Sequence, residues 1–131
     1  MPESRSALSS PDAVAVGPYS HAVVHDGLVY CSGQTPLDPS TGRLADGGIA
    51  AQTRQCFTNL LAVLDDANLS GADVLKVNVF LTDMADFADM NAVYMTIFDE
   101  PFPARTTIGV AGLPLGANIE IELIARTRST S

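Results

Sequence analysis

Residues 102–126, FPARTTIGVAGLPLGANIEIELIAR, place three ionisable side chains within two otherwise apolar strand patterns. Arg105 stands at the start of the first pattern, and Glu120 and Glu122 stand inside the second. Charged groups in apolar strands are costly to bury unless they are paired or hydrogen-bonded. A guanidinium group matches a carboxylate in a bidentate way, and a glutamate can orient or deprotonate water. We therefore expect Arg105 to hold a small carboxylic acid and a nearby glutamate to act on a water molecule.

A second interpretation of these residues is structural. In it, Arg105 and Glu120 form an ion pair that ties two strands together, because structural ion pairs use the same residue types. Alternation also puts Glu120 and Glu122 on one face of their strand, so the spacing does not select the glutamate that would act on water. The residues alone leave both questions open.

Several other polar residues lie where the chain bends or where an apolar pattern is interrupted. Tyr19 follows a Gly-Pro pair, and its spacing indicates a ring that covers a sheet edge. His21 lies in a strand pattern without a nucleophile to serve, so we interpret it as structural. Gly33, beside Ser32, indicates backbone that approaches a ligand or another chain. Asn91 lies within the apolar stripe of a predicted helix, and its spacing favours an amide that caps nearby backbone.

Length and charge limit the classes of function. The 131 residues suit one domain, and the formal net charge of −8 disfavours nucleic acids and anionic membranes as partners. Residues 1–17 contain no apolar signal-peptide core and no apolar run reaches the length of a membrane span, so we expect a cytoplasmic protein. Cys31 and Cys56 show no metal-ligand spacing, which indicates buried free thiols and no metal site.

Hydrophobic periodicity predicts the elements that carry these residues. Asp26-Gly27 indicates a hairpin turn that pairs Val23 with Tyr30. In the strand pattern of residues 74–82, Leu75 is expected to face the core together with every second residue after it. The strands are expected at 20–25, 28–32 and 74–82 and in the two halves of 102–126, and the helices at 49–67 and from Asp83 to before Pro101.

The resulting order, β-β-α-β-α-β-β, contains no repeated βαβ unit and predicts an α+β fold with two helices on one face of the sheet. Residues 1–11 are Ser-rich and polar and are expected to form a flexible arm, and residues 12–131 are expected to form a single domain. The second face of the sheet carries apolar residues among the charged ones. Because that face needs a cover, we expect it to be buried against identical subunits.

Five motifs, in this order, resemble the Rid/YjgF family of reactive-intermediate deaminases, also called the L-PSP endoribonuclease family. The resemblance runs over about residues 11–127. The motifs are GPYSHAV (17–23), YCSGQTP (30–36), KVNVFLTDMADFADMN (76–91), FPART (102–106) and NIEIELIA (118–125). The resemblance implies a chorismate-mutase-like α+β fold, a homotrimer whose sheets form a central barrel, and sites in clefts between subunits.

The activity that the resemblance implies is the hydrolysis of 2-imino and 2-enamino acids, such as 2-aminoacrylate, to 2-keto acids and ammonia. It implies a 2-iminobutanoate/2-iminopropanoate deaminase that needs no metal or cofactor. By position, it assigns binding of the substrate carboxylate to Arg105 and the hydrolytic water to Glu120. The other pocket residues that it implies are Tyr19, Ser32, Gly33 and Asn91.

Two positions differ from the pattern of many relatives. The best-known members have a cysteine two residues after the arginine, where this chain has Thr107. A residue that only lines the pocket can be threonine, whereas substrate choice or redox regulation through a thiol would be lost. We keep Thr107 as a substrate-binding residue and leave the exact imine open. His21, where many relatives carry glutamine, stays structural.

Three alternative functions remain. In the first, the protein is a non-catalytic trimer that binds a keto acid through Arg105 or acts like a chaperone. In the second, it is a deaminase of the same family that serves one particular pathway. The third is an endoribonuclease, which would need phosphate contacts, and seven Lys and Arg residues leave little material for them.

Overall fold

The computed structural model of the chain describes residues 5–11 and 17–128. The strands are β1 (Ser6–Leu8), β2 (Ala22–His25), β3 (Leu28–Gln34), β4 (Leu37–Asp38), β5 (Arg43–Leu44), β6 (Val74–Leu81), β7 (Ala104–Gly109) and β8 (Ile119–Arg126). The helices are α1 (Gly48–Asp65) and α2 (Phe87–Ile97), with the short 3-10 turns η1 (Gly71–Asp73), η2 (Met84–Asp86) and η3 (Pro114–Gly116).

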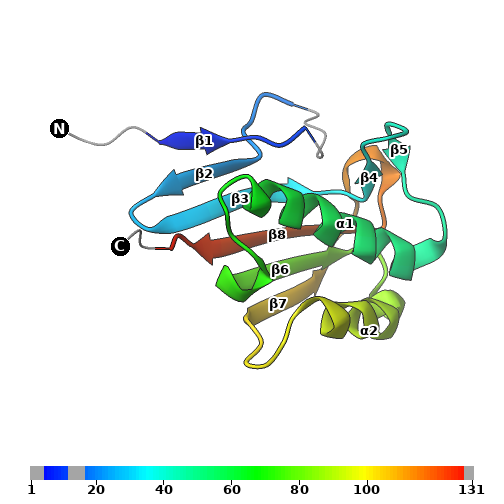
Figure 1. Cartoon of the computed structure of the whole chain (residues 1–131). Coiled ribbons are helices and arrows are strands. Elements are labelled where there is room, and N and C mark those ends of the chain that lie inside the picture. The colour runs from blue at the N-terminus through cyan, green and yellow to red at the C-terminus, as the bar shows by residue number, and fades with distance from the viewer. Residues whose placement is uncertain (1–4, 12–16, 129–131) are drawn as a thin grey trace.

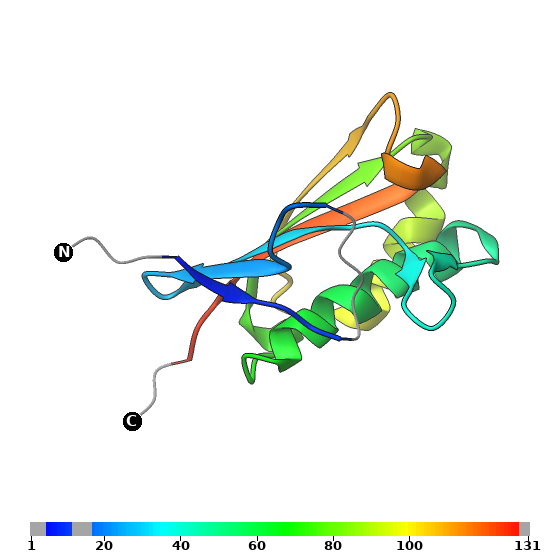
Figure 2. The same cartoon turned by 90° about the horizontal axis from the view of Figure 1, so that it is seen from above.

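One mixed sheet of six strands, in the order β1-β2-β3-β8-β6-β7, forms the body of the fold. Strands β4 and β5 form a separate two-stranded sheet. Both helices cover the same face of the large sheet, which leaves its other face without a helix (Figures 1 and 2). The predicted α+β architecture is therefore confirmed.

The β2–β3 hairpin follows the prediction from sequence. Its turn residues Asp26 and Gly27 have φ angles of 55° and 80°, the left-handed values that a tight hairpin turn requires. Val23 pairs with Tyr30, as the turn predicted. Part of the segment expected to be a flexible arm belongs to the sheet, because Ala7 in β1 pairs with Val23 on the other side of β2.

The core lies between the sheet and α1. Phe57, Leu60 and Leu64, spaced one and two helical turns apart, are fully buried against the strands. Truncation of such a side chain to alanine typically costs about 2–5 kcal/mol. Both thiols are free and buried, at Cys31 and Cys56, as the sequence indicated.

Strand β6 separates the two strands that follow it in sequence, because it pairs in parallel with β7 and antiparallel with β8. Val77 and Val79 of β6 are fully buried on the helix side. Leu75 is 45% exposed, so its predicted place in the core was wrong. The register between β6 and β8 shifts between Val74 and Lys76, which interrupts the alternation before Val77.

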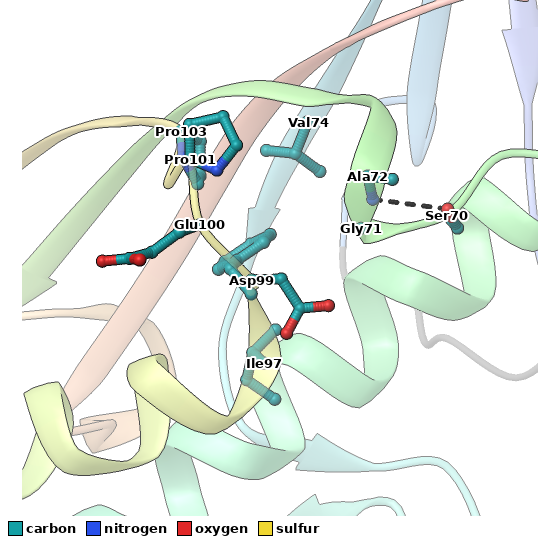
Figure 3. Close-up of a pocket in the computed structure, with 10 residues that line it drawn as sticks. Ser70, Gly71, Ala72, Val74, Ile97, Asp99, Glu100, Pro101 and Pro103 are labelled. Carbon is teal, nitrogen blue, oxygen red and sulfur yellow. Dashed lines mark hydrogen bonds between the residues drawn. The ribbon is translucent and has the colours of Figure 1, made fainter.

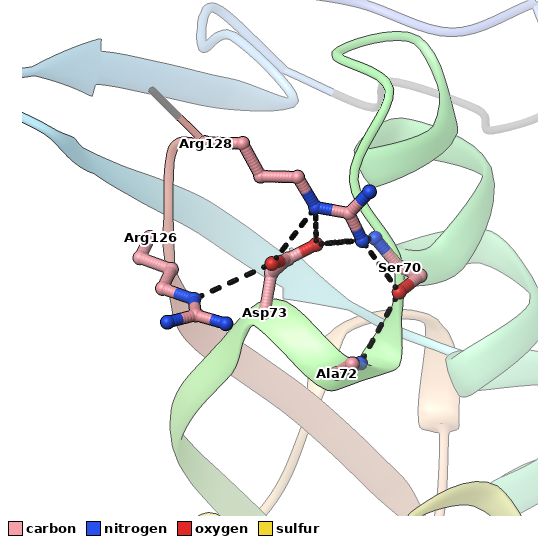
Figure 4. Close-up of polar contacts among 5 residues, drawn as sticks. All are labelled: Ser70, Ala72, Asp73, Arg126 and Arg128. Carbon is pink, nitrogen blue, oxygen red and sulfur yellow. Dashed lines mark hydrogen bonds and ion pairs between the residues drawn. The ribbon is translucent and has the colours of Figure 1, made fainter. Parts of the chain in front are cut away.

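A buried carboxylate fastens the end of β8 to the start of β6 (Figure 4). Asp73 is 1% exposed, and its carboxylate accepts a hydrogen bond from Arg128 Nε at 3.0 Å and forms ion pairs with Arg126 and Arg128. It also accepts from the backbone N–H of Ser70 at 3.0 Å. These partners, the hydrogen bond from Arg128 first, hold the pKa of Asp73 below its usual value.

In the part of the chain that the structure describes, no helix combines the length and the apolar composition needed to cross a bilayer.

Candidate active site

Strand β7 and helix α2 together position Arg105. In β7, Arg105 lies beside Val77, which is buried, so its side chain points to the helix face of the sheet. Its Nη1 donates a hydrogen bond of 2.7 Å to Asn91 Oδ1. The guanidinium carbon lies 4.5 Å from the centroid of the Tyr94 ring and 5.5 Å from that of Phe87. Three residues of α2 therefore hold one arginine of β7.

A cavity of about 400 Å³ opens beside this arginine. Its lining residues are Asn91, Tyr94, Met95, Phe102, Pro103 and Arg105. Arg105 is the one charged side chain among them, and within the described residues it forms no ion pair. A guanidinium group has five N–H donors, and the neutral amide of Asn91 occupies one of them. A partly buried cation with free donors in a largely apolar cavity suits a small carboxylate.

Glu120 lies on the other face of the sheet. It pairs in register with Phe80 of β6, whose neighbours Val79 and Leu81 are fully buried on the helix side. Its carboxylate rests against Gly33, where an added Cβ would lie 2.8 Å from Glu120 Oε2. Burial, and after it the charge of Glu122, raises the pKa of Glu120. Gly33 was expected to approach a ligand or another chain, whereas in this structure it makes room for the Glu120 side chain of its own chain.

The two glutamates of β8 have different surroundings. Glu122 Oε2 accepts a hydrogen bond of 2.9 Å from Asn78 Nδ2, so this carboxylate is already occupied. Within the described residues, the Glu120 carboxylate has no such hydrogen bond and stays available to a water molecule. A carboxylate with a raised pKa and free lone pairs suits proton transfer better than one that already accepts a hydrogen bond from an amide.

The remaining candidate residues fall into two separate groups. Ser32 lies next to Gly33, its Oγ donates to the carbonyl of Ser20 at 2.7 Å, and its N–H donates to the carbonyl of His21 at 2.9 Å. These bonds tie the segment of Tyr19 to the irregular part of β3. Tyr19 is 44% exposed and does not line the cavity of Arg105.

The other group lies on the helix side of the sheet and consists of Arg105, Asn91 and Thr107. Thr107 follows Arg105 by two residues on the same face of β7, and its Oγ1 is buried with no hydrogen-bond partner among the described residues. Within one chain, the sheet therefore separates Arg105, Asn91 and Thr107 from Glu120. The interpretation of Arg105 and Glu120 as an ion pair between strands was wrong, because β6 lies between their strands and their side chains lie on opposite faces.

Two residues that touch Arg105 were not predicted as part of the site. Phe87 and Tyr94 appear in the sequence as members of the apolar stripe of α2, with no sign of a contact to a charged group. Their spacing to Asn91, four residues before it and three after it, is the signal that all three share one face of the helix. The arginine that they meet comes from a distant strand.

A second cleft of the described structure does not suit a carboxylate ligand. A cleft of about 410 Å³ lies between η1 and the segment that joins α2 to β7 (Figure 3). Its charged lining residues are Asp99 and Glu100, both exposed acids that repel a carboxylate. Within residues 5–11 and 17–128, no three His, Cys, Asp or Glu side chains are grouped as metal ligands.

Comparisons with known proteins place this chain in a family. The family model described as Endoribonuclease L-PSP matches residues 9–127. A Bos taurus protein named 2-iminobutanoate/2-iminopropanoate deaminase is 43% identical over 122 residues, which cover 92% of this chain and 89% of the relative. The Schizosaccharomyces pombe protein named "Protein mmf1, mitochondrial" is 43% identical over 124 residues, which cover 92% of this chain and 75% of the relative. The crystal structure of RidA from the Antarctic bacterium Psychrobacter is similar, with a TM-score of 0.89 at 44% identity. The match covers 93% of this chain and 99% of the RidA chain.

Proposed function

Because the chain belongs to the Endoribonuclease L-PSP family, we propose that it is a hydrolytic deaminase of 2-imino and 2-enamino acids. It converts them to 2-keto acids and ammonia, and the name of its Bos taurus relative, 2-iminobutanoate/2-iminopropanoate deaminase, supports this class of substrate. The observation that carries the proposal is the guanidinium group of Arg105. It is held by Asn91 at 2.7 Å, has no carboxylate partner among the described residues, and faces a cavity of about 400 Å³.

The chemistry requires orientation and two proton transfers. Arg105 binds the substrate carboxylate in a bidentate way and so fixes the adjacent imine carbon. Glu120 takes a proton from water and gives it to the imine nitrogen while the water oxygen adds to that carbon, which produces a tetrahedral amino alcohol. Glu120 then moves the proton of the new hydroxyl group to the nitrogen, the C–N bond breaks, and ammonia leaves as the carbonyl group of the keto acid forms. Water and imine are consumed, keto acid and ammonia are produced, and no redox step occurs.

One chain does not bring these two groups together, so the proposal includes an assembly. We place Arg105, Asn91 and Thr107 of one subunit opposite Tyr19, Ser32, Gly33 and Glu120 of a neighbour, in a homotrimer. The uncovered sheet face supports this arrangement, because Tyr30 and Ile108 on it are each 44% exposed. An edge strand such as β7, with Arg105 at its start, is suited to meet a second chain.

A coupled assay tests the activity. An amino-acid oxidase generates the imine of alanine or of a larger amino acid in situ, and semicarbazide traps the imine that survives. We expect the protein to lower the trapped amount, and Arg105→Ala to lose this effect while it still folds and assembles. Arg105→Ala with a near wild-type rate would overturn the assignment of Arg105.

A second function is supported by the separation of Arg105 from Glu120 within the chain. The cavity of Arg105 contains the binding group for a carboxylate but no group for water, which suits a protein that binds keto acids without turnover. Tight binding of pyruvate by the wild-type protein, together with no loss of trapped imine, would favour this function over the deaminase.

A further inference from the structure

Helix α2 presents a row of three side chains to Arg105. Phe87, Asn91 and Tyr94 lie at i, i+4 and i+7, one face of a helix, and each contacts the guanidinium group. Asn91 contacts it through a hydrogen bond to one nitrogen, whereas the two rings lie within cation–π distance of its carbon. The position of the guanidinium group is therefore set by a helix and not by its own strand alone.

Tyr94 connects this row to the core. It is 4% exposed, and its ring lies 5.7 Å from that of Phe57 and 5.0 Å from that of Phe98, centroid to centroid. Its hydroxyl is buried and has no hydrogen-bond partner among the described residues, so it is closed to a ligand in the cavity. Tyr94 acts on Arg105 through the face of its ring, at 4.5 Å, and not through its hydroxyl.

Contacts through a ring face have a consequence for ligand binding. A ring in cation–π contact attracts the charge of a guanidinium group but offers no oxygen or nitrogen acceptor for its N–H groups. The rings of Phe87 and Tyr94 therefore restrain Arg105 while they leave its donors free. An acidic neighbour would restrain it equally well but would occupy the donors that a carboxylate ligand needs.

From this arrangement we propose that Tyr94 and Phe87 are positioning residues, which hold the guanidinium group of Arg105 in the orientation that receives the substrate carboxylate. The inference rests on the proposed binding of a carboxylate at Arg105. Neither ring touches the reacting atoms in this account. Their effect reaches the substrate through the arginine, and it concerns binding more than the chemical step.

Four variants separate this role from a structural one. Tyr94→Leu removes the ring that lies closer to Arg105. Phe87→Leu removes the second ring, and Phe87 is 37% exposed. Phe98→Leu is the matched control, because the Phe98 ring packs on those of Phe57 and Tyr94 but, within the described residues, makes no cation–π contact with Arg105. Tyr94→Phe keeps the ring face and removes only the hydroxyl.

The measurements are the Kd for pyruvate, by NMR titration, and KM and kcat for imine hydrolysis. We expect Tyr94→Leu and Phe87→Leu to raise both Kd and KM by about 3- to 10-fold, with kcat within about 2-fold of wild type. Phe98→Leu should lower the Tm and leave Kd unchanged, and Tyr94→Phe should bind pyruvate like wild type. If Tyr94→Leu fails to fold, Phe87→Leu decides the matter.

A Kd that is unchanged in both leucine variants, while Arg105→Ala abolishes binding, would overturn the proposal. Wild-type protein that neither binds pyruvate nor hydrolyses imines would instead refute the proposed function. The positioning role is then read from the Nε–H NMR signal of Arg105, identified by its absence in Arg105→Lys. A ring-current shift that disappears in Tyr94→Leu but persists in Phe98→Leu supports the role, and a signal unaffected by Tyr94→Leu contradicts it.

Discussion

Arg105 and Glu120 lie on opposite faces of the same sheet, in strands that flank β6 on its two sides. Arg105 faces α2 and the cavity beside it, whereas Glu120 faces Gly33 on the side without helices. A small imino acid bound at Arg105 therefore does not reach Glu120 of its own chain. If both residues act on one substrate, the second must come from another subunit, and several consequences of this arrangement are measurable.

Asn91 tests how the donors of Arg105 are used. Asn91→Asp places a carboxylate where the amide oxygen lies 2.7 Å from Nη1, so it should pair with Arg105 and compete with the substrate. We expect KM for the imine to rise by about 10-fold or more, a larger effect than in Asn91→Ala. Asn68→Asp, which adds the same charge just beyond α1, serves as the control. Imine kinetics that are equal in the two aspartate variants would contradict this use of Arg105.

Gly33 tests the place of Glu120. In Gly33→Ala the new Cβ would lie 2.8 Å from Glu120 Oε2, so the carboxylate must move. Because the φ of Gly33 is not in the left-handed region, alanine fits the backbone, and we expect a folded protein with kcat lowered by about 10-fold or more. Pyruvate binding at Arg105 should persist. Gly112→Ala, where an added Cβ has no neighbour within 4 Å, is the control. Wild-type kcat in Gly33→Ala would argue against a catalytic Glu120.

Glu122 tests the electrostatics of the same carboxylate. Burial and then the charge of Glu122 raise the pKa of Glu120, so Glu122→Gln should lower that pKa and keep the acceptor for Asn78. In the proposed mechanism deprotonated Glu120 is the active form, so activity should decline as the pH falls through its pKa. We therefore expect the acid limb of kcat/KM to move to lower pH by about half a unit. The exposed control Glu100→Gln should leave the acid limb in place. An acid limb that also stays in place in Glu122→Gln would show that protonation of Glu120 does not cause it.

Asp73 makes stability depend on pH. Its pKa is lower in the folded than in the unfolded chain, so its contribution is complete above the unfolded-state value of about 4 and is lost as the pH falls toward the folded-state value. We expect Asp73→Asn to lower the free energy of unfolding by about 2 kcal/mol near neutral pH. Urea unfolding should show that this difference from wild type shrinks below about pH 4. The exposed control Asp65→Asn should show no such difference in the free energy of unfolding. A difference independent of pH would contradict the ion pairs as its source.

Local signals predicted the fold well because they act within a few residues. The turn at Asp26 and Gly27 requires positive φ angles, and the sequence supplies residues that tolerate them. Leu75 escaped prediction because the register shift beside it depends on how β8 pairs with β6, which is a relation between distant segments. Alternation within one strand carries no information about such a shift.

The site was predictable in part, and the limits have the same origin. Residue types alone made Arg105 a candidate, but its contact with Tyr94 arises when β7 packs on α2. The sequence shows Tyr94 only as an apolar stripe residue. Spacing did not distinguish Glu120 from Glu122, because their difference lies in neighbours on β3 and β6. Asn91 entered the site through resemblance, and its bond to Arg105 gives it a physical place there.

The most direct test of the central claim is complementation between two inactive chains. Arg105→Ala and Glu120→Gln are each expected to lack imine hydrolysis, and mixing them by joint refolding creates subunit pairs in which one chain supplies Arg105 and its neighbour supplies Glu120. Random mixing in a closed ring of identical chains restores both groups at about one quarter of the sites. We expect activity near that fraction of wild type. A mixture as inactive as its two parents, with trimers formed, would contradict a site shared between subunits.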